Sequence, residues 1–205
     1  MVYAQSIPAV AFVGRQNSGK TTLMVRLIAE LSSRGVRVGT VKHHSHAGFD
    51  FDAEGKDSWR HGQAGSCFTV VAAPDKIASV QKLDPDVEMP LQRILEQMTA
   101  AALAGAAGAP DGAGPRLDVI LVEGYRKSGL PTIELFRADN PKDADRPLGG
   151  EGNRIVAVVT DIPRIASEAA SFEDGHDKGG IPVYGFDDIV ALADFIQSAI
   201  ITPCQ

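Results

Sequence analysis

The sequence of 205 residues predicts an α/β fold with a mostly parallel sheet covered by helices on both faces. Two patterns in the sequence lead to this prediction. Short apolar runs, typical of buried strands, alternate with segments in which apolar residues recur at helical spacing. A glycine-containing polar segment separates the first such strand from the first helix. The composition, 44% hydrophobic and 22% charged, is ordinary for a globular protein, so we expect a single domain over residues 1–205.

The first part of the chain predicts a strand, a helix and a second strand. Residues 10–13 are apolar and predict a buried strand, and residues 36–43, VRVGTVKH, predict another. A helix is expected between them, because apolar residues recur at helical spacing after Lys20 and the pattern stops at Gly35; these residues are Leu23, Leu27, Ile28 and Leu31. A unit of this kind has parallel strands and a right-handed crossover.

The remaining elements include a β-hairpin, further strands and further helices. Residues 67–73 and 77–83 flank Pro74-Asp75 and predict two antiparallel strands joined by a turn. Other strands are expected at 117–124, 132–137 and 154–161, and helices at 57–63, 88–103 and 189–200. Two segments are expected to be flexible, a Gly/Ala/Pro-rich stretch at 105–115 and a polar stretch at 138–153.

Residues 14–21, GRQNSGKT, match the pattern G-x-x-x-x-G-K-[ST] of a phosphate-binding P-loop. Gly14 and Gly19 let the backbone turn its N–H groups toward a phosphate, and the following helix adds its positive dipole end. Lys20 is expected to reach the β- and γ-phosphates, and the Thr21 hydroxyl to bind Mg²⁺. With a strand before the motif and a helix after it, the fold expected is a P-loop NTPase three-layer sandwich with the added β-hairpin.

P-loop NTPases need a second acidic group near the magnesium, and the segment LDVILVEGY offers two. Asp118 begins this predicted strand and Glu123 ends it, roughly 16 Å away in an extended chain, so only one of them can lie beside the phosphates. Ligands of open α/β sheets bind at the carboxyl ends of the strands. Glu123 is therefore the candidate catalytic and metal-binding residue, and Asp118 reads as an exposed residue at the start of the strand.

The loop after the second strand also leaves the sheet at a carboxyl end. Asp50 or Asp52 could hold a magnesium-bound water or orient the attacking water, although a solvated acidic loop has the same composition. The loop also contains a histidine cluster that could bind a transition metal or an anion, or have no role: His43, His44 and His46.

Base recognition is less clearly encoded. The guanine-binding pattern N-K-x-D is absent, and NPKD at 140–143 lies in a polar stretch and not at a strand end. Asp161 follows a predicted strand, where a carboxylate can accept hydrogen bonds from the N1–H and amino groups of guanine, a pair of donors that adenine lacks. Asp161 reads equally well as a turn residue or helix cap before Pro163. These residues favour GTP over ATP weakly.

Charge and composition exclude several classes of protein. The net charge of −6 argues against a nucleic-acid binder that depends on bulk positive charge. No apolar run reaches the length of a membrane span, and the first residues do not resemble a signal peptide. Two cysteines, Cys67 and Cys204, lie far apart in sequence and suggest neither a disulfide framework nor a zinc ribbon. We therefore expect a cytoplasmic protein.

Five segments, taken in order, carry a family resemblance: FVGRQNSGKTTL, VGTVKHHSH, DFDAEGKDSWRHGQAGS, DVILVEGYRKSGLPTIELFR and RIVAVVTD. They resemble the MobB family of molybdopterin-guanine dinucleotide biosynthesis adapter proteins. The similarity runs from about residue 7 to the final helix, and two segments discriminate far better than the P-loop: GKDSWRHGQAG and LVEGYRKSGLPTIEL. The stretch at 105–115 does not look like a family element and reads as an insertion.

The resemblance implies a P-loop GTPase-like fold, a homodimer, binding of GTP and Mg²⁺, and slow hydrolysis. It also implies an auxiliary role beside MobA, the guanylyltransferase that joins GMP to molybdopterin, in delivering nucleotide or in passing the molybdenum cofactor to molybdoenzymes. Asp50 and Glu123 match acidic positions near the metal. The phosphate cradle implied by the family comprises Gly14, Asn17, Ser18, Gly19, Lys20, Thr21 and Thr22, and a nucleotide or dimer contact is implied for Lys56, Asp57 and Arg60.

Two other classes of protein share the P-loop. A nickel-insertion GTPase would need a metal site, and this chain offers histidines without a cysteine at ligand spacing. A small-molecule kinase would need an acceptor pocket and usually a lid, for which the stretch ADNPKDADRPLGG is the candidate. Beyond Arg15 and Arg26 no arginine finger is evident, so we expect slow hydrolysis.

Overall fold

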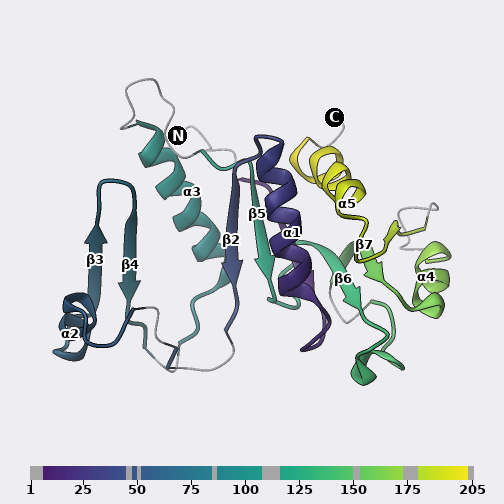
Figure 1. The fold of residues 1–205 in the computed structure, drawn as a ribbon, viewed down its shortest axis with the longest axis horizontal. Coiled ribbons are helices and arrows are strands. Elements are labelled where there is room, and N and C mark those ends of the chain that lie inside the picture. The colour runs from purple at the N-terminus through teal and green to yellow at the C-terminus, as the bar shows by residue number, and fades with distance from the viewer. Residues whose placement is uncertain are drawn as a thin grey trace. The chain divides into compact units, whose positions relative to one another are not determined.

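The computed structural model describes residues 7–44, 48–49, 52–84, 87–107, 116–149, 153–172 and 180–202. The chain divides into two compact units, and each is described here by itself (Figure 1). The larger unit combines the chain up to residue 43 with the chain from residue 94 onward, and the smaller unit is residues 44–93.

The larger unit is built on a six-stranded sheet whose neighbouring strands are all parallel. The spatial order is β2-β5-β1-β6-β7-β8, so β1, which leads into the P-loop, lies near the centre. The strands are β1 (Ala9–Val13), β2 (Val38–Lys42), β5 (Val119–Glu123), β6 (Pro131–Phe136), β7 (Arg154–Thr160) and β8 (Val183–Tyr184). The carboxyl ends of these strands therefore share one edge, which is where ligands of open α/β sheets bind.

The helices lie between strands along the chain, except for the last helix, which follows β8. They are α1 (Lys20–Ser33), α3 (Leu91–Ala107), α4 (Pro163–Ala170) and α5 (Ile189–Phe195), with α5 continuing as a π-helical stretch, Ile196–Ile201. A short 3₁₀ helix, η1 (Pro141–Asp143), follows β6. No helix among the described residues is long and apolar enough to cross a membrane.

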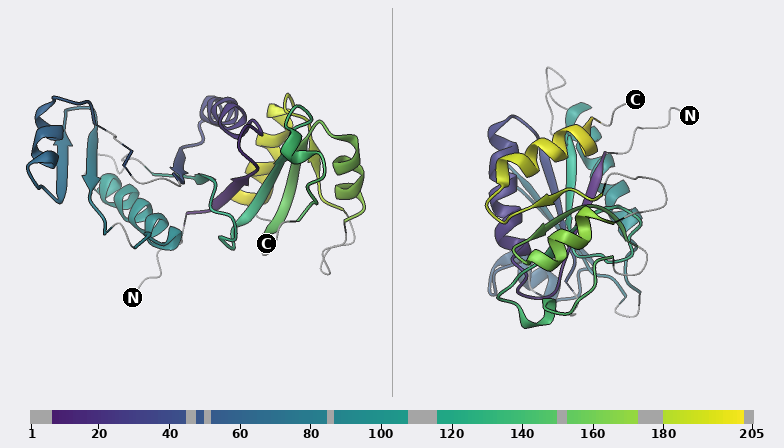
Figure 2. Two further views of the ribbon diagram at one scale, coloured as in Figure 1. Left: turned by 90° about the horizontal axis from the view of Figure 1, so that it is seen from below. Right: turned by 90° about the vertical axis from the view of Figure 1, so that its right-hand side faces the viewer.

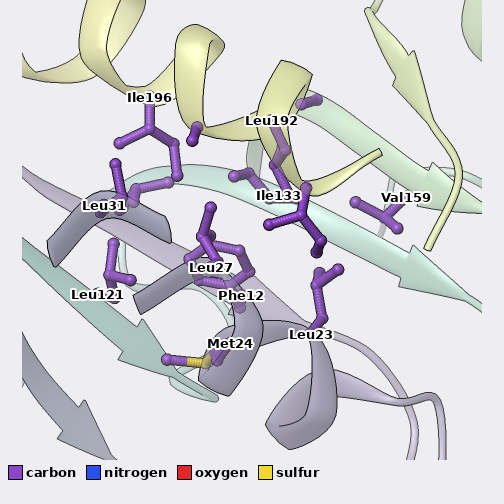
Figure 3. Packing of buried hydrophobic residues seen from close by; sticks show 14 of the residues in the cluster. Phe12, Leu23, Met24, Leu27, Leu31, Leu121, Ile133, Val159, Leu192 and Ile196 are labelled. Carbon is purple, nitrogen blue, oxygen red and sulfur yellow. The ribbon is translucent and has the colours of Figure 1, made fainter. Parts of the chain in front are cut away.

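One face of the sheet packs against α1 and α5, and Figure 3 shows this core at close range. Three leucines at helical spacing on α1 (Leu23, Leu27 and Leu31) are almost completely buried, as the apolar periodicity predicts. They meet α5 and alternate residues of four strands; these partners are Phe12, Leu121, Ile133, Val159, Leu192 and Ile196.

The opposite face carries a second cluster, because successive residues of a strand point to opposite sides. Phe136 and Val158 leave β6 and β7 on this side and pack with Ile165 and Ala169 of α4. Both views in Figure 2 show α4 beside the strands at the β7 end of the sheet. The two clusters together confirm the three-layer α/β sandwich that the sequence predicts.

The smaller unit contains α2 (Asp57–Gln63) and a separate two-stranded sheet. Strands β3 (Phe68–Ala72) and β4 (Ile77–Gln81) pair antiparallel, which confirms the predicted hairpin. Large apolar side chains of both strands are exposed, including Phe68 and, at 75%, Ile77. An isolated hairpin of two strands is only marginally stable in water.

The helices differ from the prediction in three respects. Helix α3 begins at Leu91 and not at residue 88, because Pro90 disfavours helical backbone in the residue before it. It then extends to Ala107, into the stretch expected to be flexible, because alanine is the best helix former; residues 108–115 lie outside the described residues. Helix α4 was not predicted from the sequence, although Pro163 at its first turn and the buried pair Ile165 and Ala169 mark it.

Candidate nucleotide-binding site

The P-loop connects the end of β1 to the start of α1 through left-handed backbone. Asn17 and Gly19 have φ values of 66° and 82°. Gly14 has no space for a side chain, since a Cβ there would lie 2.4 Å from Oγ of Ser18 and 3.1 Å from the carbonyl oxygen of Leu135. The close packing of Gly14 and the turn at Gly19 explain why the motif requires glycine at both positions.

The N-terminus of α1 opens into a pocket with about 240 Å³ of space. Its lining comes from residues 16–17 and 19–22 of the P-loop and from Glu123. Among the described residues no side chain caps this end of α1, and its first turn holds no acidic residue. The backbone N–H groups of the first turn are therefore available to an anion, which the helix dipole also favours.

Lys20 lies folded back on the loop. Its ammonium group donates to the carbonyl oxygens of Gly14 and Arg15, at 3.1 and 2.7 Å, and lies 3.4 Å from the Ser18 hydroxyl. Burial lowers the pKa of Lys20, the nearby Glu123 carboxylate opposes that change, and the Arg126 guanidinium adds to it. A half-buried ammonium held by neutral carbonyls gains from a phosphate anion, because the anion replaces weak acceptors with a full negative charge.

Glu123 ends β5 next to the P-loop, with only 15% of its side chain exposed. Its Oε1 accepts a hydrogen bond from the Thr21 hydroxyl at 3.0 Å, and its Oε2 lies 3.4 Å from the Lys42 ammonium. A hydroxyl and a carboxylate within hydrogen-bonding distance are oxygen donors of the kind that Mg²⁺ prefers, with waters and phosphate oxygens completing its shell. The pair therefore fits a magnesium ion bound with a nucleotide.

Asp118 lies at the amino end of the same strand, away from the P-loop. Its carboxylate accepts hydrogen bonds from the Arg37 guanidinium at 2.7 and 2.9 Å and from the Arg37 backbone N–H at 2.8 Å. These bonds lower the pKa of Asp118. Asp118 joins β5 to the start of β2, which is a structural role.

Asp50 and His46 lie outside the described residues, so the role expected for Asp50 stays a prediction. His43 follows β2 in the larger unit, where its ring lies 4.6 Å from that of Tyr125. The described residues contain no group of three or more His, Cys, Asp or Glu side chains placed to hold a metal ion.

Asp161 lies just after β7, where it contacts the loop that follows β6. Its Oδ1 accepts a hydrogen bond from the Ala138 backbone N–H at 2.6 Å, and its Oδ2 lies 3.6 Å from Arg137. The cap residue of α4 is Ile162, so Asp161 does not cap that helix. Arg137 in turn stacks on Phe186 at 4.3 Å, and both approach Gly19 of the P-loop. These contacts place Asp161 near the start of α1.

A buried polar network behind the P-loop is not evident from the sequence. Asn140 donates from Nδ2 to the carbonyl oxygen of Gln16 at 3.1 Å and to the Asp143 carboxylate at 2.9 Å. Arg146 lies 2.6 Å from Glu134 and 3.0 Å from Asp143. Its guanidinium also stacks on the ring of Phe136, 3.7 Å from the centroid. The NPKD segment is therefore a support for the P-loop in this structure, and its residues 140 and 143 are buried.

The loop after Glu123 holds a second feature that is not evident from the sequence. Tyr125 and Lys127 both have positive φ, 54° and 63°, which is uncommon outside glycine. Between them, the exposed Arg126 donates a hydrogen bond to the carbonyl oxygen of Gly14 at 3.1 Å. The signal in the sequence was an arginine three residues after the strand-end carboxylate.

The sequence matches the family model described as "Molybdopterin guanine dinucleotide synthesis protein B" over residues 9–161, which is more than half of the chain. The chain belongs to the MobB family. A molybdopterin-guanine dinucleotide biosynthesis adapter protein from Escherichia coli (strain K12) is 31% identical over 93% of this chain and 91% of its own length. One from Haemophilus influenzae is 34% identical over 77% and 76% of the two chains.

Solved MobB structures have the same fold. The crystal structure of Bacillus subtilis MobB superimposes with a TM-score of 0.65 and 25% identity, covering 96% of this chain and all of the other. A crystal structure of molybdopterin-guanine biosynthesis protein B has a TM-score of 0.61 and 26% identity, covering 94% and 99%. The MobB membership that the sequence segments predict is thus confirmed.

Proposed function

We propose that this protein is a GTP-binding adapter in the biosynthesis of molybdopterin guanine dinucleotide. The observation that supports the proposal most directly is the pocket at the start of α1, in which the P-loop, Lys20, Thr21 and Glu123 come together in a chain of the MobB family. The relatives in Escherichia coli and Haemophilus influenzae are named as adapter proteins of this pathway.

In the proposed complex the backbone of residues 14–22 binds the β-phosphate and Lys20 moves from the loop carbonyls to the phosphates. Thr21 and Glu123 bind Mg²⁺, which neutralises phosphate charge when it is bound. Asp50, for which the structure provides no geometry, is proposed to act with them through a metal-bound or attacking water. Hydrolysis of GTP is expected to be slow, as suits a carrier or switch better than a fast enzyme.

Guanine is proposed to bind beside Asp161, because this carboxylate lies after β7 and Arg137 connects it to Gly19 at the start of α1. The carboxylate would accept from the guanine N1–H and amino groups, donors that adenine lacks as a pair. Asp161→Asn should therefore weaken binding of GTP more than binding of ATP.

The partners we propose follow from the adapter role. They are the MobA-like guanylyltransferase that joins GMP to molybdopterin, the molybdenum cofactor itself and the molybdoenzymes that receive it, all in the cytoplasm. A pull-down of the guanylyltransferase with this protein, with and without GTP, tests that role. Retention of the enzyme supports it, and no retention under either condition contradicts it.

We also propose that the protein is a homodimer. The hairpin of the smaller unit leaves large apolar side chains of both strands exposed, among them Phe68, Val70 and Ile77. Both strands are edge strands, so each has unpaired backbone groups that another chain can cover. Light scattering should give twice the mass of the 21.6 kDa chain, and Ile77→Lys should shift it toward the monomer. A monomeric wild-type protein at micromolar concentration contradicts this proposal.

The nucleotide assignment is tested by titration with GTP and ATP in the presence of Mg²⁺. GTP should bind more tightly, and Lys20→Ala should lose about ten- to a hundredfold or more in affinity, because it removes charge-assisted hydrogen bonds to the phosphates. Arg154→Ala is a matched control, since Arg154 is an exposed cation at the other end of the strands.

A further inference from the structure

Two cationic groups converge on one oxygen atom beside the P-loop. The carbonyl oxygen of Gly14 accepts a hydrogen bond from the Lys20 ammonium at 3.1 Å and another from the Arg126 guanidinium at 3.1 Å. The two nitrogens therefore lie no farther apart than the sum of these distances. A neutral carbonyl cannot balance two positive charges, whereas a phosphate group can.

The loop that carries Arg126 is held in an uncommon conformation. The residues on either side of it, Tyr125 and Lys127, have left-handed backbone, which is strained for a non-glycine residue, and such strained residues cluster at functional sites. Both ends of the loop are anchored to the sheet region. The Gly124 N–H donates to the carbonyl oxygen of Phe12 at 3.0 Å, and the Lys127 N–H donates to the side chain of Asn153 at 2.8 Å.

We propose that Arg126 is a phosphate-binding residue that contacts the terminal phosphate of a bound nucleoside triphosphate. The loop begins directly after Glu123, which pairs with Thr21 on the side where the metal is expected, and Arg126 shares an oxygen with Lys20, the residue expected to reach the β- and γ-phosphates. This inference rests on the proposed nucleotide site but not on the choice of guanine.

A residue that contacts the terminal phosphate contributes to the affinity for triphosphates but not to the affinity for diphosphates. In Arg126→Ala we expect about tenfold weaker binding of a non-hydrolysable GTP analogue, in line with the loss of one charge-assisted hydrogen bond at an exposed position. Binding of GDP should change by less than about twofold. Arg126→Lys keeps the charge without the planar fork of donors, so it should fall between the wild type and Arg126→Ala.

The competing explanation is that Arg126 only holds the Gly14 carbonyl in place. In that case Arg126→Ala weakens binding of triphosphate and diphosphate by the same factor and lowers the midpoint of thermal unfolding. Arg154→Ala again provides the control for loss of one exposed positive charge.

The experiment measures dissociation constants of two pairs of nucleotides, each made of a triphosphate analogue and a diphosphate, one pair with guanine and one with adenine. It does so for the wild type and for Arg126→Ala, Arg126→Lys and Arg154→Ala. A selective loss of triphosphate affinity supports the proposal in whichever pair binds. An equal loss for both nucleotides of a pair, or no loss, overturns it. If the wild type prefers the adenine nucleotides, the assignment of GTP is overturned, but the losses of triphosphate and diphosphate affinity in Arg126→Ala can still be compared. If neither pair binds, both proposals are overturned.

Discussion

Replacing Arg146 by methionine tests the buried network that supports the P-loop. Methionine keeps much of the aliphatic length but removes the guanidinium that contacts Glu134, Asp143 and the carbonyl oxygen of Leu135. Glu134 is 1% exposed and Asp143 is fully buried, so the substitution leaves two carboxylates inside the protein without their cation. It also removes the stacking of the guanidinium on Phe136.

The magnitude follows from the burial of these groups. Removing one partner of a buried ion pair typically costs about 3–5 kcal/mol, because the remaining charge is buried and uncompensated. For a chain of this size, 1 kcal/mol corresponds to roughly 2–4 °C in the midpoint of thermal unfolding. We therefore expect Arg146→Met to lower that midpoint by roughly 6–20 °C at pH 7.

The loss should also depend on pH. Burial already raises the pKa of Glu134, and Arg146 opposes that change. Without Arg146 the Glu134 carboxyl group is easier to protonate in the folded than in the unfolded protein. Its protonation therefore favours the folded state at low pH, and this advantage disappears as pH rises. The penalty of Arg146→Met should therefore be smaller near pH 5 than at pH 7.

Urea unfolding of the wild type and Arg146→Met at the two pH values measures this effect, with Arg154→Met as the control for an exposed arginine. The control should stay within about 0.5 kcal/mol of the wild type. A loss below about 1 kcal/mol at pH 7, or an equal loss at both pH values, would refute the reasoning.

Three further predictions concern single residues. Asp118→Asn should cost roughly 1 kcal/mol at pH 7, a small value because the pair with Arg37 is partly exposed. Because the pKa of Asp118 is lowered in the folded protein, the difference from the wild type in urea unfolding should begin to shrink as pH falls below about 4 and vanish only below that lowered pKa. Asn140→Ala removes the hydrogen bond to the carbonyl of Gln16, so calorimetry should show several-fold weaker nucleotide binding; unchanged affinity contradicts a supporting role. Thr21→Ala should reduce the gain in GTP affinity on adding Mg²⁺, and an undiminished gain counts against Thr21 as a ligand.

Elements that are encoded locally were predictable from the sequence. The strands of the large sheet are apolar runs, and the P-loop is a contiguous motif whose glycines are fixed by local geometry at Gly14 and Gly19. Glu123 could be placed beside the P-loop because it ends its strand, and ligands of open α/β sheets bind at the carboxyl ends of the strands. Helix α4 was missed because it is short and its apolar face consists of few residues.

Contacts between distant segments were not predictable. Asn140 and Gln16 are 124 residues apart, and nothing in the polar stretch after β6 indicates that it packs behind the P-loop. Arg146 and Glu134 belong to segments that look like an exposed loop and a buried strand, and only the fold shows that they pair. Arg126 was missed for the same reason, since its partner Gly14 lies 112 residues earlier.

The central claim is that the pocket at the start of α1 binds GTP with Mg²⁺. Calorimetric titration of the wild type and Lys20→Ala with GTP and ATP, each with Mg²⁺, tests it most directly. We predict tighter binding of GTP than of ATP by the wild type and a loss of about ten- to a hundredfold or more in Lys20→Ala. Equal or tighter binding of ATP, or unchanged affinity in Lys20→Ala, would contradict it.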